Sequence, residues 1–171
     1  PALERSPGIR KSFGRLCERA GITVLVPKGI EKLGCGTPWS SKGLEAGQAT
    51  MNAKTLAALR IATRDGELPI VCDASSCTEG LRQTIEHDPS GKPMTVVDSV
   101  EFALTHILPT LPHHARLESL ALHPTCSSTR LGLNGSLGAV AGAGAERVEV
   151  PRNGGGGEFG LLHLLLVGCH R

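Results

Sequence analysis

Residues 33–43 have the sequence LGCGTPWSSKG, which places Cys35 between two glycines and contains the only tryptophan of the chain. Glycines on both sides of a thiol let backbone amides approach whatever the sulfur binds, because neither residue carries a Cβ atom. Pro38 stiffens the loop, and the two serines can cap a helix that follows. We therefore expect a strand-to-helix loop that carries chemistry; the alternative is a structural turn with one buried cysteine.

Outward from this loop, strand and helix patterns alternate along the chain. Short apolar runs predict strands at residues 22–26, 68–72, 117–123 and 148–150. Apolar residues at helical spacing predict helices at residues 12–20, 44–62, 98–108 and 131–145. Asp98 and Glu101 have the spacing of a capping box at the start of the third helix. This alternation predicts an α/β fold, in which short parallel sheets are flanked by helices and the cysteine loops lie at the carboxyl ends of the strands.

Two segments of the chain share one pattern: a helix end, a strand, a proline and a glycine-rich loop. The first segment covers residues 18–27 and leads to the loop around Cys35. The second covers residues 143–151 and leads to the glycine run at residues 154–157. We therefore expect two similar halves, about residues 1–112 and 113–171, whose loops gather at one sheet edge.

Length and composition limit the classes of function. A chain of 171 residues can bury one ordinary core, or two small half-domains that share one. A net charge of +2 and an aromatic content of 2% argue against nucleic-acid binding, which uses basic surfaces and stacking aromatic rings. Because the sequence has no run of about twenty apolar residues, we expect no transmembrane segment. The chain begins with Pro1 and without a signal peptide, which predicts a fragment of a longer polypeptide.

The six cysteines do not have the pattern of a disulfide-rich mini-protein. The chain is too long and too rich in ordinary core residues for that class, and it lacks the paired Cys-x-x-Cys motifs of a structural zinc site. Cys17 lies in a helical pattern and is expected in the core. Three others follow apolar runs beside Ser, Thr or Gly, which predicts exposed loop tips at strand ends: Cys35, Cys77 and Cys126.

Three motifs carry a family resemblance: CGTPWSSKG at residues 35–43, CDASSCTEG at residues 72–80 and HPTCSS at residues 123–128. They are similar to the C-terminal cysteine-rich module of FAD-linked D-lactate dehydrogenases. That module belongs to the "CCG" domain group, which also includes subunits of heterodisulfide reductase and of anaerobic glycerol-3-phosphate dehydrogenase. The resemblance covers nearly the whole chain, and its first two motifs are specific.

The resemblance implies an iron–sulfur electron-transfer module downstream of a flavin domain. In that arrangement, the flavin domain holds FAD and oxidises a 2-hydroxy acid such as D-lactate, and the module passes electrons to a quinone or a cytochrome. The flavin domain is not in this sequence, so lactate oxidation by this chain alone is not expected. The implied location is cytoplasmic, either free or peripheral at the inner face of the membrane.

A [4Fe–4S] cluster is held by four thiolates and tuned by hydrogen bonds to its sulfurs. The resemblance implies Cys35, Cys77 and Cys126 as ligands, with Cys72 or Cys169 as the candidate for the fourth. Three residues around the first loop are expected to donate hydrogen bonds to sulfur: Gly34, Gly36 and Ser40. For His123 two interpretations stay open, a bond to the cluster or packing at a strand end.

The chain departs from the family pattern at two points. Gly34 stands where the family usually has the first of two adjacent cysteines, and residues 155–157 are glycines where the second Cys-Cys-Gly would fall. Glycine cannot replace a thiolate. The alternative hypothesis is therefore a degenerate, metal-free structural or assembly domain that docks on the flavin domain or on a partner subunit.

Overall fold

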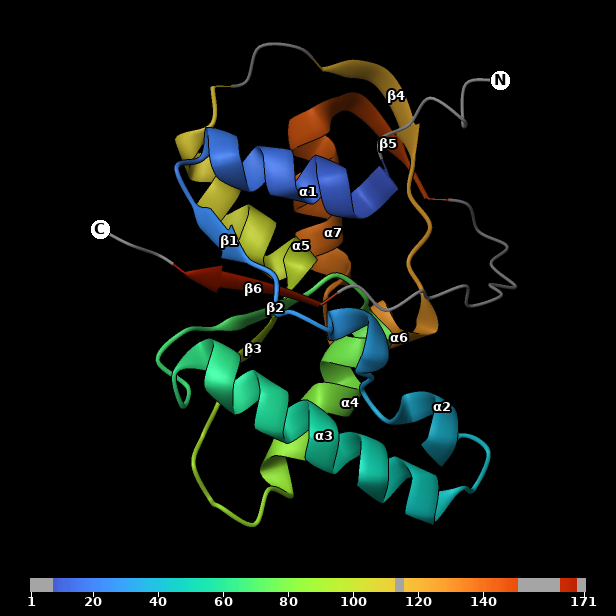
Figure 1. Ribbon diagram of the computed structural model, residues 1–171. Coiled ribbons are helices and arrows are strands. Elements are labelled where there is room, and N and C mark those ends of the chain that lie inside the picture. Colours follow the sequence, from blue (N-terminus) through green and yellow to red (C-terminus); the bar gives the residue numbers. More distant parts are fainter. Residues whose placement is uncertain (1–7, 113–115, 151–163, 169–171) are drawn as a thin grey trace.

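Helices and short strands alternate in the computed structural model, which describes residues 8–112, 116–150 and 164–168 (Figure 1). The strands are β1 (Thr23–Leu25), β2 (Ile70–Cys72), β3 (Val96–Asp98), β4 (Leu117–Ala121), β5 (Ala145–Glu149) and β6 (Leu164–Gly168). The α-helices are α1 (Gly8–Arg19), α2 (Thr37–Ser40), α3 (Glu45–Thr63), α4 (Ser75–Glu86), α5 (Ser99–Phe102), α6 (Cys126–Arg130) and α7 (Asn134–Gly144). The remaining turns are η2 (Ile30–Lys32), η3 (Ala103–Ile107) and η4 (Leu108–Thr110).

The strands form two separate sheets. The larger has the order β1-β6-β2-β3, in which β2 and β3 are parallel and β6 is antiparallel to both of its neighbours. The smaller pairs β4 with β5 in parallel. The predicted α/β class, with short parallel pairings flanked by helices, is therefore confirmed. The position of β6 was not predicted: this strand from the C-terminal end lies between β1 and β2 (Figure 1).

Most predicted elements match observed ones. The strands expected at residues 22–26, 68–72 and 117–123 correspond to β1, β2 and β4, each shortened by two residues. The helices expected at residues 12–20 and 44–62 correspond to α1 and α3, although α1 begins earlier, at Gly8. The strand expected at residues 148–150 corresponds to β5. It begins three residues earlier than expected, at Ala145, directly after the last residue of α7.

The loop expected around Cys77 is wrong, because residues 75–78 form the first turn of helix α4. The buried face of this helix consists mainly of small or polar residues: Cys77, Thr78, Gly80 and Thr84, with Leu81 as its only large apolar member. Apolar periodicity is the signal by which a helix is recognised in a sequence, and this face hardly carries it. Cys77 therefore lies on a helix and not at a loop tip.

Asp98 ends β3 and caps α5, as predicted. Its Oδ1 atom accepts a hydrogen bond of 3.0 Å from the backbone N–H of Val100, and its Oδ2 atom accepts one of 3.0 Å from the hydroxyl of Thr78. The buried carboxylate therefore links α4 to the β3–α5 junction. Glu101, the expected partner in a capping box, lies 3.7 Å from the Arg82 guanidinium. The helix expected to reach residue 108 changes to a π-turn at residue 103.

Most of the buried apolar residues form two clusters on opposite faces of β2, because successive side chains of a strand point to opposite sides. One cluster consists of Cys35, Leu59, Ile70, Cys72, Cys77, Leu81, Met94 and Val96. The other consists of Phe13, Cys17, Val71, Phe102 and Ile107. The prediction that Cys17 is a core residue is confirmed, and burial raises the pKa of its thiol to about 11.

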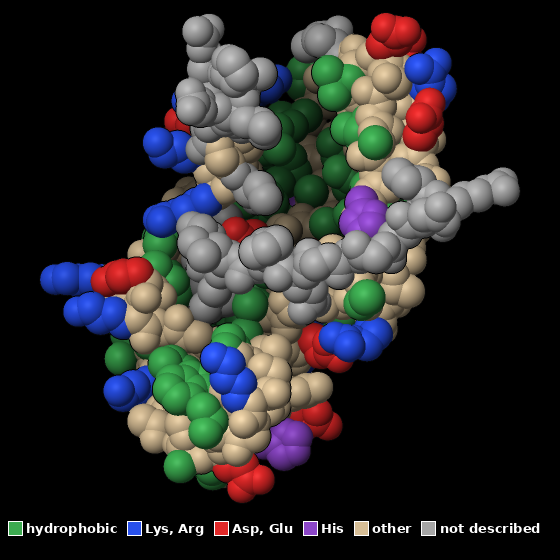
Figure 2. All heavy atoms as spheres, turned by 90° about the vertical axis from the view of Figure 1, so that its right-hand side faces the viewer, with side chains coloured by type: hydrophobic (Ala, Val, Ile, Leu, Met, Phe, Trp, Pro, Cys, Tyr) green, Lys and Arg blue, Asp and Glu red, His purple; other side chains and the backbone are tan. Residues whose placement is uncertain are grey.

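The surface mixes charges of both signs. Figure 2 shows Lys and Arg side chains interspersed with Asp and Glu side chains over the side that carries β4, α6 and α2. Among the described helices, none combines the length and the apolar character needed to cross a membrane. Two features named in the sequence analysis lie outside the described residues: the glycines at 154–157 and Cys169.

Candidate functional site

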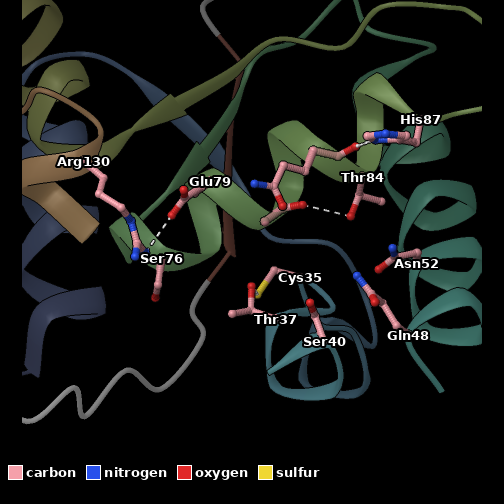
Figure 3. Close-up of a pocket in the computed structure, with 12 residues that line it drawn as sticks. Cys35, Thr37, Ser40, Gln48, Asn52, Ser76, Glu79, Thr84, His87 and Arg130 are labelled. Carbon is pink, nitrogen blue, oxygen red and sulfur yellow. Dashed lines mark hydrogen bonds and ion pairs between the residues drawn. The ribbon is translucent and has the colours of Figure 1, made fainter. Parts of the chain in front are cut away.

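A cavity of ≈ 500 Å³ opens beside Cys35, between α2, α3 and α4 (Figure 3). Its walls are mostly polar and include Ser40 of α2, Gln48 and Asn52 of α3, and Gln83 of α4. At one end, the Arg130 guanidinium of α6 forms an ion pair of 3.0 Å with Glu79 of α4. The Oδ1 atom of Asn52 is buried and has no hydrogen-bond partner within the described part of the chain.

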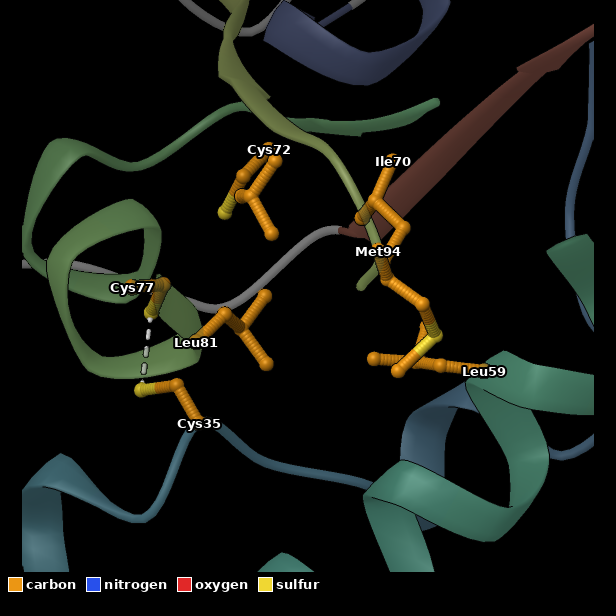
Figure 4. Packing of buried hydrophobic residues seen from close by; sticks show 8 residues of the cluster. Cys35, Leu59, Ile70, Cys72, Cys77, Leu81 and Met94 are labelled. Atoms are coloured by element: carbon orange, nitrogen blue, oxygen red, sulfur yellow. Dashed lines mark hydrogen bonds between the residues drawn. The ribbon is translucent and has the colours of Figure 1, made fainter. Parts of the chain in front are cut away.

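Three cysteine side chains, one of them Cys35 of the cavity wall, lie in one buried cluster (Figure 4). The sulfur atoms of Cys35 and Cys77 lie 3.3 Å apart, although the two residues are 42 positions apart in the sequence. Cys72, the last residue of β2, interacts with Cys77 from the other side. All three side chains are buried. The expectation that Cys35 and Cys77 occupy exposed loops is therefore wrong.

A close contact between α4 and the first loop brings Cys35 and Cys77 together. Gly80 lies one turn after Cys77 on the same face of α4. A Cβ atom at Gly80 would lie 2.5 Å from the Thr37 hydroxyl oxygen and 3.0 Å from the carbonyl oxygen of Cys35. Only glycine permits this approach, so Gly80 sets the distance between the helix and the cysteine loop.

The buried hydroxyl of Thr55 holds the other side of the loop against α3. It donates a hydrogen bond of 2.9 Å to the carbonyl oxygen of Gly34 and accepts one of 3.3 Å from the N–H of Gly34. The Gly34 amide, which was expected to bond a sulfur, is thus bonded to Thr55. A Cβ atom at Gly34 would meet Met51 at 3.6 Å, an ordinary van der Waals contact, so this position has room for a side chain.

The three thiols differ in their readiness to lose a proton. Hydrogen bonds from the Cys77 thiol and, to a smaller extent, from the Thr37 hydroxyl lower the pKa of Cys35 from 9.0 to about 6, against the opposing effect of burial. The Cys77 thiol also lowers the pKa of Cys72. Because Cys77 donates to both neighbours and is itself buried, its own pKa is raised. At neutral pH the site therefore favours a thiolate at Cys35 that accepts a hydrogen bond from a protonated Cys77.

The other residues expected at the site lie around it. Ser40 is exposed at the end of α2 and contributes to the cavity wall. Gly36 is buried and has a left-handed backbone conformation (φ 79°), which turns the chain into α2. His123 is exposed after β4. Cys126 is exposed and is the first residue of α6, a helix and not the loop tip expected for it.

Thr125 caps the helix that carries Cys126, since its hydroxyl oxygen accepts a hydrogen bond of 3.1 Å from the N–H of Ser128. We expect Thr125→Ala to lower the free energy of unfolding by about 1 kcal/mol in urea denaturation, because the Ser128 N–H loses its partner. Thr125→Asn keeps a capping oxygen and should stay within a few tenths of a kcal/mol of the unmodified chain. Equal losses in both variants would show that the cap contributes nothing.

Three buried cysteines, Cys35, Cys72 and Cys77, have the side-chain chemistry that the ligands of an iron–sulfur group require. Thiolate is the form of cysteine that binds metal, and the lowered pKa values of Cys35 and Cys72 favour it. Within the described ranges, however, no group of three or more His, Cys, Asp or Glu side chains already has an arrangement that could hold a metal ion. Cys35, Cys72 and Cys77 are therefore candidate ligands that would have to adjust on binding, and Cys126 stands apart from them in α6.

Comparisons with protein-family models, with curated proteins and with solved structures found no match to this chain. A function therefore has to be inferred from the converging thiols, the cavity beside Cys35 and the sequence resemblance. Sequence reasoning missed three residues that build the site: Thr37, Thr55 and Gly80. Only Gly80 had a usable signal, because it is three residues from Cys77 and shares a face with it once residues 75–86 are taken as a helix.

Proposed function

We propose that this chain is the iron–sulfur electron-transfer module of a flavin-dependent oxidoreductase that acts on D-lactate or a related 2-hydroxy acid. The module would receive electrons from the FAD of a flavin domain in the same full-length polypeptide and pass them to a quinone or a cytochrome. One observation carries the proposal. The two specific motifs of the resemblance, residues 35–43 and 72–80, are the segments that bring Cys35, Cys72 and Cys77 together.

These three cysteines would hold the group, which when bound supplies one-electron transfer at a potential set by its surroundings. The protein contributes the surroundings. The Thr37 hydroxyl oxygen accepts a hydrogen bond of 3.3 Å from the Cys35 thiol, and once that thiol has lost its proton the hydroxyl would donate to the sulfur and withdraw electron density from it. Leu81 and Met94 pack in the same cluster as the sulfurs and keep water away from them.

The site reaches the surface on the Cys35 side. Cys35 lines the cavity, whereas Cys72 is fully buried at the end of β2. The shortest route for electrons between a docked domain and the sulfurs therefore passes through Cys35. Trp39, at 39% exposure in α2, directly precedes Ser40 of the cavity wall and would offer an apolar contact to the flavin domain or the acceptor.

A metal-free structural or assembly domain is the second candidate. It is favoured by Gly34, which stands where the family usually has a cysteine, and by the lack of a preformed metal-binding group among the described side chains. In that case the three thiols serve as small apolar core residues, and the chain docks on the flavin domain or a partner subunit without carrying electrons.

Iron and acid-labile sulfide contents separate the two candidates. We expect the 171-residue chain, purified anaerobically, to be brown, to contain iron and sulfide in equal amounts and to absorb visible light. Cys35→Ser should reduce both contents to background, because the residue that links the site to the loop is lost. Gly34→Cys should raise iron retention, since the position has room for a side chain.

Cys17→Ala is the matched control, because Cys17 is equally buried but lies in the cluster on the opposite face of β2. It should leave the iron and sulfide contents unchanged. Cys126→Ser tests the exposed cysteine as a fourth ligand and should lower both contents if α6 supplies it. A colourless chain with six titratable thiols and no sulfide, before and after anaerobic reconstitution, would rule out the electron carrier and leave the structural domain.

A further inference from the structure

We propose that Cys35 and Cys77, in the chain free of iron, form a redox-active dithiol that reduces peptide disulfides entering the cavity beside Cys35. This activity needs no metal and does not depend on the electron-transfer function proposed above. Three features carry it: the distance between the two sulfurs, the position of Cys35 in the cavity wall, and the polar groups that line the cavity.

The two sulfurs are nearly close enough to bond. A disulfide has a sulfur–sulfur distance of about 2.05 Å, so the 3.3 Å separation of Cys35 and Cys77 has to shrink by only about 1.3 Å. The close contact between Gly80 and the loop holds the two segments together, so this pair is the one that we expect to form the disulfide.

The cavity decides which sulfur reacts first. Cys35 lines the wall of the ≈ 500 Å³ cavity, whereas Cys77 is not among the residues of that wall (Figure 3). A molecule in the cavity therefore meets Cys35 first. This arrangement makes Cys35 the attacking sulfur and Cys77 the resolving one.

The lining favours a peptide over an apolar disulfide. The buried Oδ1 atom of Asn52 has no hydrogen-bond partner among the described residues and can accept a hydrogen bond from a peptide N–H. Gln48 and Gln83 add amide groups to the same walls. The Arg130–Glu79 ion pair at one end can open to hold a carboxylate and an ammonium group, the two charged ends of a small peptide.

The reaction needs only this chain and one substrate disulfide, because the two thiols of the chain supply both electrons. The thiolate of Cys35 attacks one sulfur of the substrate disulfide, which forms a mixed disulfide and releases the first substrate thiolate. The sulfur of Cys77 then attacks the sulfur of Cys35, gives up its proton and releases the second substrate thiol. The substrate disulfide gains two electrons, and the Cys35–Cys77 disulfide is the oxidised product.

The test uses the full chain, treated with a chelator and carrying Cys126→Ser and Cys169→Ser, so that neither the exposed Cys126 nor Cys169, which lies outside the described residues, can react. Oxidised glutathione is the probe, and intact mass with peptide mapping is the readout. We expect a Cys35–Cys77 disulfide and the release of two reduced glutathione molecules per chain. In Cys77→Ser, release should fall by half, and a glutathionyl group should stay on Cys35. In Cys35→Ser, release should fall to background.

Folding is checked by circular dichroism in each variant, and Cys17→Ala serves as the control that should still react fully. A disulfide that joins Cys72 to Cys77, or glutathionylation that needs prior unfolding of the chain, would overturn the proposal. Because iron is removed beforehand, failure of this test does not bear on iron binding. Conversely, a chain that binds no iron can still pass it.

Discussion

Replacing Gly80 with alanine should lower the free energy of unfolding by up to about 2 kcal/mol and separate Cys35 from Cys77. The new Cβ atom would lie 2.5 Å from the Thr37 hydroxyl and 3.0 Å from the carbonyl oxygen of Cys35, and the latter is backbone that cannot rotate away. Overpacking of this kind costs about 1–3 kcal/mol, and the roughly 1 kcal/mol that alanine adds to helix propensity offsets only part of it. Helix α4 must then shift outward and take Cys77 with it.

Gly138→Ala is the matched control, because Gly138 lies in helix α7 and a Cβ atom there meets nothing within 4 Å. The same substitution should stabilise the chain by about 0.5–1 kcal/mol at that position. Urea denaturation measures both variants, and the yield of the Cys35–Cys77 disulfide after oxidised glutathione treatment should fall only in Gly80→Ala. Stabilisation of both variants by the same amount would mean that α4 does not press on the cysteine loop.

The parts of the fold that were predictable are those with a strong local signal. The apolar runs of β1 and β2 and the long helix α3 are visible because apolar residues recur at the period of the element. The cap at Asp98 is visible because its carboxylate acts within two residues. The α/β class follows from the alternation of these elements.

The parts that were not predictable depend on contacts between distant segments. Strand β6 lies between β1 and β2, and no pattern within residues 164–168 specifies antiparallel pairing with strands about 100 and 140 positions earlier. Helix α4 was missed because most of its buried face is small and polar, which is what allows it to approach Cys35 so closely.

The sequence motifs indicated Cys35, Cys77 and Cys126 as ligands, with Cys72 as a candidate for the fourth. The structure brings Cys35, Cys72 and Cys77 into one cluster, which does not include Cys126. The contributions of Thr37 and Thr55 could not be read from the sequence, because each depends on a hydrogen bond formed only after the loop folds against α3 and α4. The burial of Cys35 and Cys77 likewise results from packing of α4, which was not foreseen.

The pH dependence of Cys35 alkylation should have its midpoint near pH 6. The pKa of Cys35 is lowered from 9.0 to about 6, first by the hydrogen bond from Cys77 and then by Thr37. A lowered pKa keeps the reactive thiolate present to a lower pH, so alkylation by iodoacetamide is lost only as the pH falls through about 6. Cys77→Ala removes the largest cause and leaves burial, which raises the pKa, so the midpoint should move to about pH 9 or above.

The pH midpoint of Cys35 alkylation distinguishes the variants more clearly than the alkylation rate at a single pH does. At pH 7 a pKa of 6 gives about 90% thiolate and a pKa of 9 about 1%, but a less basic thiolate is also a weaker nucleophile, with a Brønsted coefficient of about 0.4–0.5. These effects oppose each other, so the rate at pH 7 changes by less than tenfold while the midpoint moves by about three pH units. Cys77→Ser keeps a hydroxyl donor and should give an intermediate midpoint, as should Thr37→Val. If Cys77→Ala leaves the midpoint unchanged, the Cys77 thiol does not donate to Cys35, and the pairing of the two sulfurs inferred from their 3.3 Å separation is wrong.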